Sequence, residues 1–230
     1  MTKMEPPDSK RYDSGRELLK WIALTTMTVD HIGLILYPQI PALRIVGRIS
    51  YPLFAYLLVL GMSSTRDPGK YFKRMVYFAL LSQLPFAIAN EVPIWQHLNI
   101  FFTLSLGIIL IYLLDRNNIL LLVPLIASVI IPVDYGAYGL ATILFLYLMR
   151  ILRRTGLILL IALNLMLIPF ESTYQPLALL ALPIILLHSN GRLTLSSRSE
   201  RTSHPLFSKY FFYVYYPAHL LALALVRTIQ

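Results

Sequence analysis

The chain contains no cysteine, which excludes a disulfide scaffold, a cysteine metal site and a thiol nucleophile. It also contains little charge, because only 13% of its residues are Asp, Glu, Lys or Arg while 57% are apolar. Soluble domains are about 25% charged, so a water-soluble surface is excluded. A mean hydropathy of +0.65 excludes a disordered chain. The remaining class is a membrane protein with several spans, and 230 residues have room for roughly nine or ten.

The apolar residues fall into nine segments behind a polar stretch. We predict an all-α fold, a polytopic transmembrane helical bundle, with a cytoplasmic tail over residues 1–17 and a single domain over residues 18–230. The tail lacks the cleavage site of a secretory signal, so we do not expect its removal. The fifth to eighth segments are short, so we expect their helices to be only slightly tilted or the bilayer to be thinner around them. The predicted spans are Leu18–Tyr37, Leu43–Ser63, Tyr71–Asn90, Leu98–Leu114, Ile119–Val133, Tyr138–Arg150, Leu157–Phe170, Tyr174–His188 and Lys209–Val226.

The distribution of Lys and Arg predicts the orientation of the nine spans. All except Arg44, Arg48 and Arg227 lie in the tail, at the start of the first span or around the even-numbered connections. Since cytoplasmic loops are rich in Lys and Arg, we expect the N-terminus in the cytoplasm and the C-terminus outside, in the cell membrane. The net charge of +9 is therefore a topology signal and not a nucleic-acid-binding stripe.

The first predicted span carries two adjacent titratable residues, Asp30 and His31. Asp30 lies about 12 residues into the span, or roughly 18 Å deep at 1.5 Å per residue. Ionisable residues at this depth are costly and usually functional. His is the common general base near neutral pH, and a carboxylate can orient it or balance its charge. We therefore expect His31 and Asp30 to be catalytic, although a structural ion pair and a hydrogen-bonded core histidine would also account for them.

Other polar residues also lie within or beside the predicted spans. Arg48 is close in depth to Asp30, and both a buried Asp30–Arg48 pair and a contact with a substrate phosphate or carboxylate would satisfy it. Tyr216 and His219 stand three residues apart on one face of the last span. No pair of histidines has the spacing of a metal site, so we expect no metal. A glycine-rich phosphate loop and a serine nucleophile elbow are both absent from the sequence.

Six stretches, in order along nearly the whole chain, resemble the TraX-like membrane proteins, which take their name from the conjugative pilin N-acetyltransferase. They are 27–33 (MTVDHIG), 47–56 (GRISYPLFAY), 78–86 (FALLSQLPF), 99–104 (NIFFTL), 134–139 (DYGAYG) and 215–220 (YYPAHL). Two positions depart from the pattern, because Gln83 and Ala87 stand where acids are expected. These departures allow acceptor contacts different from those of a pilin acetylase.

The resemblance implies a membrane acetyltransferase that uses acetyl-CoA as co-substrate, with an intramembrane histidine, here His31 with Asp30, in the catalytic role. The acceptor would be an amine or hydroxyl of a pilin-like protein, a glycan or a lipid-linked sugar. We expect Arg153 and Arg154 to bind the acetyl-CoA phosphates from the cytoplasm. The expected substrate-binding residues lie in the matching stretches: Arg48, Ser82, Gln83, Asn99, Asp134, Tyr135, Tyr216 and His219.

Two other classes of function remain open at this stage. A proton-coupled transporter would use Asp30, His31 and His219 as a relay. A non-catalytic protein of surface-filament assembly would use the same polar residues only to join helices. Binding of acetyl-CoA separates the acetyltransferase from both.

Overall fold

The computed structural model describes residues 14–169, 174–193 and 210–230, and these form helices joined by short connections, with one isolated bridge between Leu98 and Val133. Most of the predicted tail, the end of the seventh span at Phe170 and the basic residues Arg198, Arg201 and Lys209 lie outside the described residues.

Each of the nine predicted segments contains helix at its predicted place. The helices are α1 (Ser14–Ile35), α2 (Pro41–Gly47), α3 (Ser50–Ser64), α4 (Pro68–Asn90), α5 (Ile100–Leu114), η1 (Ile119–Leu121), α6 (Leu122–Ile130), α7 (Gly136–Ile151), α8 (Arg153–Met166), η2 (Gln175–Leu180), α9 (Ala181–Ser189) and α10 (Phe211–Ile229).

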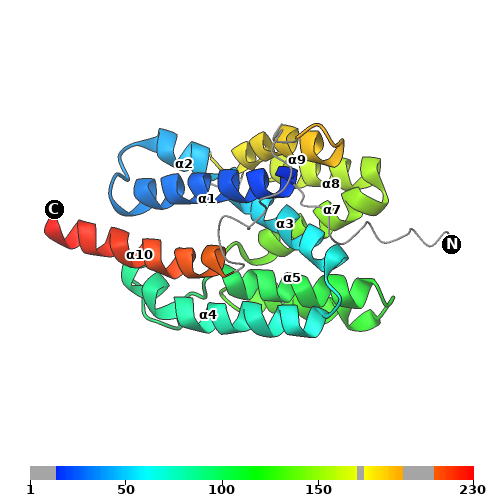
Figure 1. Ribbon diagram of the computed structural model, residues 1–230, viewed down its shortest axis with the longest axis horizontal. Coiled ribbons are helices and arrows are strands. Elements are labelled where there is room, and N and C mark those ends of the chain that lie inside the picture. Colours follow the sequence, from blue (N-terminus) through cyan, green and yellow to red (C-terminus); the bar gives the residue numbers. More distant parts are fainter. Residues whose placement is uncertain (1–13, 170–173, 194–209) are drawn as a thin grey trace, which may run out of the picture.

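The long helices lie side by side along the longest axis of the molecule (Figure 1). α1, α4 and α10 run in the same direction, and α10 packs against both of the others. α3 crosses the interior, where it packs against α1, α5 and α7. Its fully buried leucines, Leu53 and Leu58, belong to one continuous apolar core. α3 and the three helices packed against it therefore form the frame that positions polar side chains inside the bundle.

Three helical stretches among the described residues are long and apolar enough to cross a membrane: Ser14–Ile35, Pro41–Ser64 and Phe211–Ile229. Four further apolar stretches are shorter than a standard span, which agrees with the short fifth, sixth and eighth segments. α4 has 23 residues, but its first turns carry Lys70, Lys73 and Arg74. The structure thus supports a membrane-embedded helical bundle.

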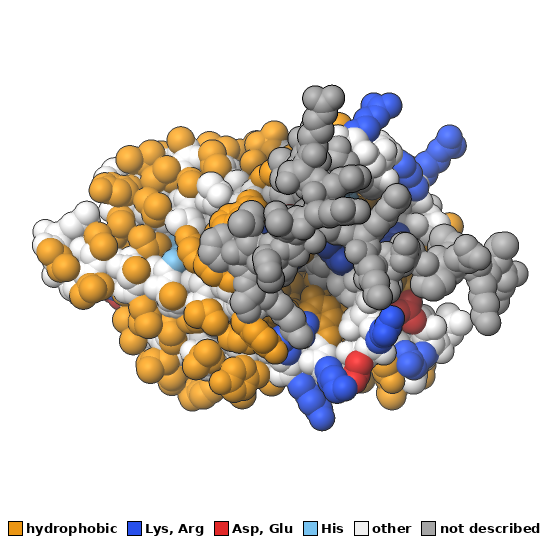
Figure 2. Space-filling model, viewed as in Figure 1, with side chains coloured by type: hydrophobic (Ala, Val, Ile, Leu, Met, Phe, Trp, Pro, Cys, Tyr) orange, Lys and Arg blue, Asp and Glu red, His pale blue; other side chains and the backbone are white. Residues whose placement is uncertain are grey.

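The outer surface of the bundle is apolar where α4 faces away from the core. Tyr77, Leu80, Leu81, Leu84 and Ile88 are each about half exposed, and their spacing places them on one helical face. On the face shown in the space-filling view, apolar side chains gather over the left half, and Lys and Arg lie toward the opposite end (Figure 2). An exposed apolar surface of this extent marks contact with lipid or another apolar partner.

The second predicted span, Leu43–Ser63, lies within the helical stretch Pro41–Ser64, which has a short interruption at Arg48 and Ile49. α2 ends at Gly47 and α3 begins at Ser50. Pro52 has no N–H to donate to the Arg48 carbonyl, and the Ser50 hydroxyl donates to the Gly47 carbonyl at 2.8 Å. At Gly47 a Cβ atom would lie 2.0 Å from Oδ1 of Asp30. Only glycine therefore lets α2 approach Asp30 so closely.

Candidate functional site

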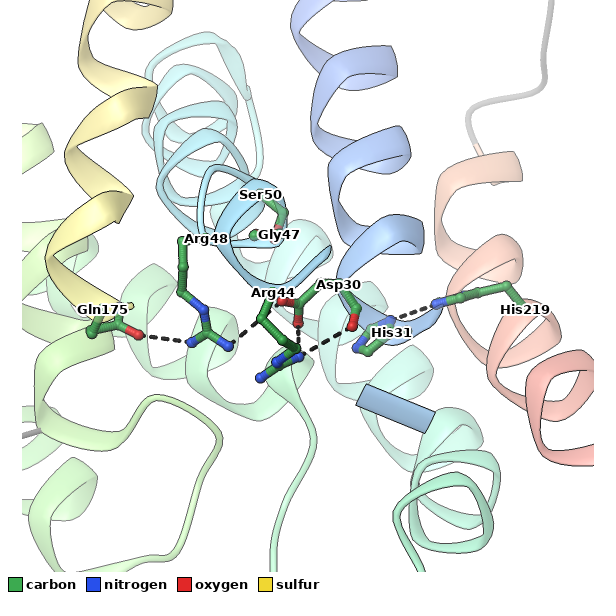
Figure 3. A network of polar contacts seen from close by, with 8 residues as sticks. All are labelled: Asp30, His31, Arg44, Gly47, Arg48, Ser50, Gln175 and His219. Carbon is green, nitrogen blue, oxygen red and sulfur yellow. Dashed lines mark hydrogen bonds and ion pairs between the residues drawn. The ribbon is translucent and has the colours of Figure 1, made fainter. Parts of the chain in front are cut away.

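Asp30 lies at the contact between α1 and α2, where two guanidinium groups face it (Figure 3). Arg44 Nη1 donates to Asp30 Oδ2 at 2.6 Å and to the Asp30 backbone carbonyl at 3.2 Å. Arg48 Nη2 lies 3.6 Å from Asp30 Oδ1 without a hydrogen bond. The predicted Asp30–Arg48 pair is confirmed as an ion pair, but the closer partner of Asp30 is Arg44.

Arg48 reaches across to a third element. Its Nη1 donates to Oε1 of Gln175, the first residue of η2, at 2.8 Å. Its Nε is buried and has no hydrogen-bond partner, and the hydroxyl of Tyr51 is unpartnered in the same way. Buried polar atoms without partners are rare in native structures and are commonly satisfied by a water, an ion or a ligand.

His31 is joined to His219 on α10, so histidines 188 residues apart meet inside the bundle (Figure 3). His219 Nδ1 lies 2.9 Å from the Tyr215 carbonyl oxygen, which can only accept a hydrogen bond, so Nδ1 carries the proton. In a neutral ring, His219 Nε2 then has the lone pair, and His31 Nδ1, 2.7 Å away, donates to it. The lone pair of a neutral His31 is therefore on Nε2.

These groups line a central cavity of about 640 Å³. Its wall includes Met27, Asp30, His31 and Leu34 from α1, and Phe86 and Asn90 from the end of α4. His31 belongs to this wall, and its Nε2 makes no hydrogen bond to any described residue. Six of the sequence-predicted site residues come together here: Asp30, His31, Arg48, Asp134, Tyr135 and Tyr216. His219 stands behind His31 and does not line the cavity itself.

Asp134 and Tyr135 lie at the rim of the central cavity, just before α7. Asp134 Oδ1 is 3.9 Å from His97 Nε2, and this carboxylate raises the pKa of His97 above its usual value. The Tyr135 ring stacks on Tyr51 with centroids 4.1 Å apart, and its backbone is left-handed with φ 61°. A left-handed tyrosine is a strained conformation of the kind found at functional sites.

Three predicted substrate-binding residues, Ser82, Gln83 and Asn99, do not line this cavity. Gln83 donates to the carbonyls of Ile94 and His97 and accepts from both nitrogens of Asn99. The Asn99 side chain also donates to the Ala79 carbonyl and caps α5 through the amide of Phe101. Gln83 and Asn99 thus hold the connection between α4 and α5 in place, and Ser82 is fully buried on α4.

A second cavity of about 470 Å³ follows the first along the bundle, and we call it the basic-end cavity. It is lined by Arg16 and Lys20 near the start of α1 and by Arg74 near the start of α4, whereas the central cavity takes the later parts of both helices. The two cavities share four lining residues: Phe54, Phe101, Leu104 and Phe212. Arg153 and Arg154, at the start of α8, line neither, and Arg153 donates to the Asn190 side chain at 2.8 Å.

Sequence reasoning missed Arg44 and Gln175. Arg44 is four residues before Arg48, on the same face of a helix, which was a usable signal. Gln175 is a polar side chain next to Pro176 at the start of an apolar segment, and nothing in its position indicates a partner 127 residues away. Among the residues that the structure describes, no three His, Asp or Glu side chains group as a metal site.

Comparison with known proteins adds three findings. The family model described as "TraX protein" matches residues 15–227. A protein of Dichelobacter nodosus named "Probable fimbrial assembly protein FimC, serogroup H1" is 26% identical over 151 residues, 60% of this chain and 62% of its own length. "Uncharacterized protein RP591" of Rickettsia prowazekii (strain Madrid E) is 51% identical over 41 residues, 18% of this chain and 16% of its own. The chain thus covers less than two thirds of either relative. No solved structure is significantly similar to it.

Proposed function

The chain belongs to the TraX protein family, and from this membership and the geometry around His31 we propose that it is an integral membrane acyltransferase. It transfers the acetyl group of acetyl-CoA to an amine or hydroxyl of an acceptor in the cell membrane or at its surface. The observation that carries the proposal is a histidine that lines a cavity together with Asp30, Arg44 and Arg48, and whose hydrogen bond through Nδ1 leaves the lone pair on Nε2.

In this mechanism His31 acts as the general base. Nε2 takes the proton of the acceptor amine or hydroxyl as that nitrogen or oxygen attacks the thioester carbonyl. The carbon–sulfur bond then breaks, and the proton passes from Nε2 to the departing thiolate of CoA. A positioned base of this kind contributes about 10²–10⁴ in rate. The other route open to the same atom is transient acylation of Nε2 followed by transfer to the acceptor.

His219 supports this role as a positioning residue. By accepting from His31 Nδ1 it holds the tautomer that has the lone pair on Nε2. When Nε2 gains a proton, the hydrogen bonds through His219 to the Tyr215 carbonyl stabilise the resulting positive charge. Asp30 makes no hydrogen bond to His31 in the structure, so its role in the mechanism is to balance the charges of Arg44 and Arg48 beside the reacting groups.

The succession of two cavities suits donor and acceptor arriving from opposite ends. The basic-end cavity presents Arg16, Lys20 and Arg74, with Glu17 as its acidic residue, which favours the phosphates of acetyl-CoA. From Lys20 to His31 is eleven residues of α1, or roughly 16 Å at 1.5 Å per residue. The acetyl end of an extended donor would pass Phe54 and Phe212 to reach His31.

Acetyl-CoA binding and turnover test the proposed activity. Substitutions of Arg74 and Arg154 test the route by which acetyl-CoA enters the bundle. The release of CoA thiol can be followed with a thiol reagent without background, because the protein has no cysteine. Arg74→Gln is expected to raise the KM for acetyl-CoA about tenfold with little change in kcat, since it removes a phosphate contact. Arg154→Gln, outside both cavities, is the matched control. A raised KM in the Arg154 variant alone would place the donor on the α8 side, as the sequence predicted.

Membrane topology gives a second test. With nine spans, a reporter fused after Gln230 is expected outside the cytoplasm, and one inserted near Ser196 is expected inside. The physical reason is the confinement of Lys and Arg to the even-numbered connections. Reporter activity on the same side from both positions would contradict the nine-span arrangement, because that arrangement places one span, Lys209–Val226, between the two sites.

A function in surface-filament assembly is the second candidate, favoured by the similarity to the fimbrial assembly protein of Dichelobacter nodosus. The two proposals are compatible if the acceptor is a pilin-like protein. Binding and consumption of acetyl-CoA distinguish the two proposals, because a non-catalytic assembly protein neither binds nor consumes acetyl-CoA.

A further inference from the structure

Arg48 has hydrogen-bonding capacity that the protein leaves unused. Its Nη1 donates to Gln175, whereas Nε and Nη2 form no hydrogen bond with the residues that the structure describes. These two nitrogens lie on the same edge of the guanidinium group, which is the fork that binds a carboxylate or phosphate with two parallel hydrogen bonds. Arg48 lines the central cavity, but its Nε is buried, so an anion that binds this edge requires a rotation of the guanidinium group away from Asp30 and toward the cavity.

The charge of Arg48 is also incompletely neutralised by the protein. Arg44 contacts Oδ2 of Asp30 at 2.6 Å, while Arg48 stays 3.6 Å from Oδ1, which accepts no hydrogen bond from the described residues. The other carboxylate of the cavity, Asp134, faces His97, whose pKa it raises. The side chain of Arg48 is only 14% exposed. A buried cation requires a paired anion. Arg48 shares the carboxylate of Asp30 with Arg44, which is the closer partner.

We propose that the acceptor carries an oxyanion, a carboxylate or a phosphate, which binds the Nε–Nη2 edge of Arg48 in the central cavity. This inference rests on the proposed acyl transfer at His31, and it names the chemical class of the acceptor. The acceptor is then a bifunctional molecule, with a nucleophilic amine or hydroxyl at His31 Nε2 and an anionic group at Arg48. Gln175 positions the guanidinium by holding Nη1, so that the other edge is left for the ligand.

The first test measures anion binding without catalysis. The thermal stability of the purified protein in detergent is compared in sodium phosphate, sodium acetate and sodium chloride at equal ionic strength. We expect phosphate or acetate to raise the melting temperature by a few degrees over chloride, as ligand binding to the native state does. Arg48→Lys keeps the charge but loses the fork and should lose most of this increase. Arg227→Gln removes a cation that lines neither cavity and should retain it.

The second test uses three acceptors of similar size: ethanolamine, O-phosphoethanolamine and β-alanine. They offer an amine beside a hydroxyl, a phosphate or a carboxylate, and thiol release from acetyl-CoA reports turnover. We expect the wild type to use at least one anionic acceptor with a kcat/KM about tenfold or more above that for ethanolamine. In Arg48→Lys this ratio should fall toward one, and in Arg227→Gln it should not change. Preference for one anion identifies it as phosphate or carboxylate.

The outcomes separate this inference from the acyltransferase proposal. Turnover of all three amines at similar kcat/KM would overturn the oxyanion assignment and leave the acyltransferase in place. Anion stabilisation lost in Arg48→Lys, without turnover of any acceptor, would leave the anion site in place and count against acyl transfer. Stabilisation by anions that is equal in wild type and Arg48→Lys would also overturn the assignment. If Arg48→Lys does not fold, Gln175→Leu frees the guanidinium and should reduce the same preference.

Discussion

Replacing His31 with alanine is expected to abolish acyl transfer while the bundle remains folded and still binds acetyl-CoA. His31 lines the central cavity, and its hydrogen bond to His219 leaves the lone pair of the neutral ring on Nε2. Loss of a general base lowers the rate by about 10²–10⁴, and loss of an acyl carrier removes the reaction altogether. The measurement is thiol release from acetyl-CoA, together with donor binding by calorimetry.

The matched control is His188→Ala. His188 also contacts an aromatic partner, with its Nδ1 3.1 Å from the Tyr56 hydroxyl, but it lines neither cavity. We expect turnover close to wild type in this variant. Full turnover in His31→Ala would show that the catalytic assignment is wrong, and His219 would become the candidate base.

Asp30→Asn is expected to cause the largest loss of stability of any substitution in the site. Asp30 accepts from Arg44 and faces Arg48, so the variant leaves two guanidinium groups without their carboxylate. Removing one partner of a buried ion pair costs about 3–5 kcal/mol. The expected result is a much lower thermal unfolding temperature in detergent and a reduced yield of folded protein.

Two further variants make this expectation specific. Glu91→Gln breaks an ion pair with Arg227 in which the Glu91 side chain is 72% exposed, and exposed pairs contribute no more than about 1 kcal/mol. Asp30→Asn combined with Arg44→Met removes the excess charge and should be better folded than Asp30→Asn alone. Equal losses in Asp30→Asn and Glu91→Gln, or strict additivity of Asp30→Asn and Arg44→Met, would contradict a buried ion pair at this position.

The positions of the helices were predictable because hydropathy is a local property of the chain. All nine predicted segments contain helix, and their short members are short in the structure. The interruption between α2 and α3 has local causes in Pro52 and Ser50, and a proline inside a span predicts a kinked helix at this place. A kinked helix can stay continuous or be interrupted, and what decides between them is how closely Gly47 packs on Asp30.

The site was predictable only as a set of residue types. The cost of burying polar groups in an apolar segment identified Asp30, His31, Arg48 and His219 from the sequence. It did not show that His31 pairs with His219, since that contact depends on how α1 and α10 pack. It also did not separate Asn99 and Gln83 from the cavity residues. Both are buried amides in spans, and only their saturated hydrogen bonds identify them as supports of a connection.

The four side chains that line both cavities have a consequence for the energetics of the membrane. A protein hollowed from both ends would act as a pore for protons and ions if water filled it continuously. Phe54, Phe101, Leu104 and Phe212 are all apolar, and an apolar constriction of this kind resists wetting. If the bundle spans the membrane as proposed, these side chains would interrupt a continuous path of water and so preserve the electrochemical gradient. The proposed acyl transfer would then move only the acetyl group past this apolar layer, while CoA and the acceptor each stay on their own side.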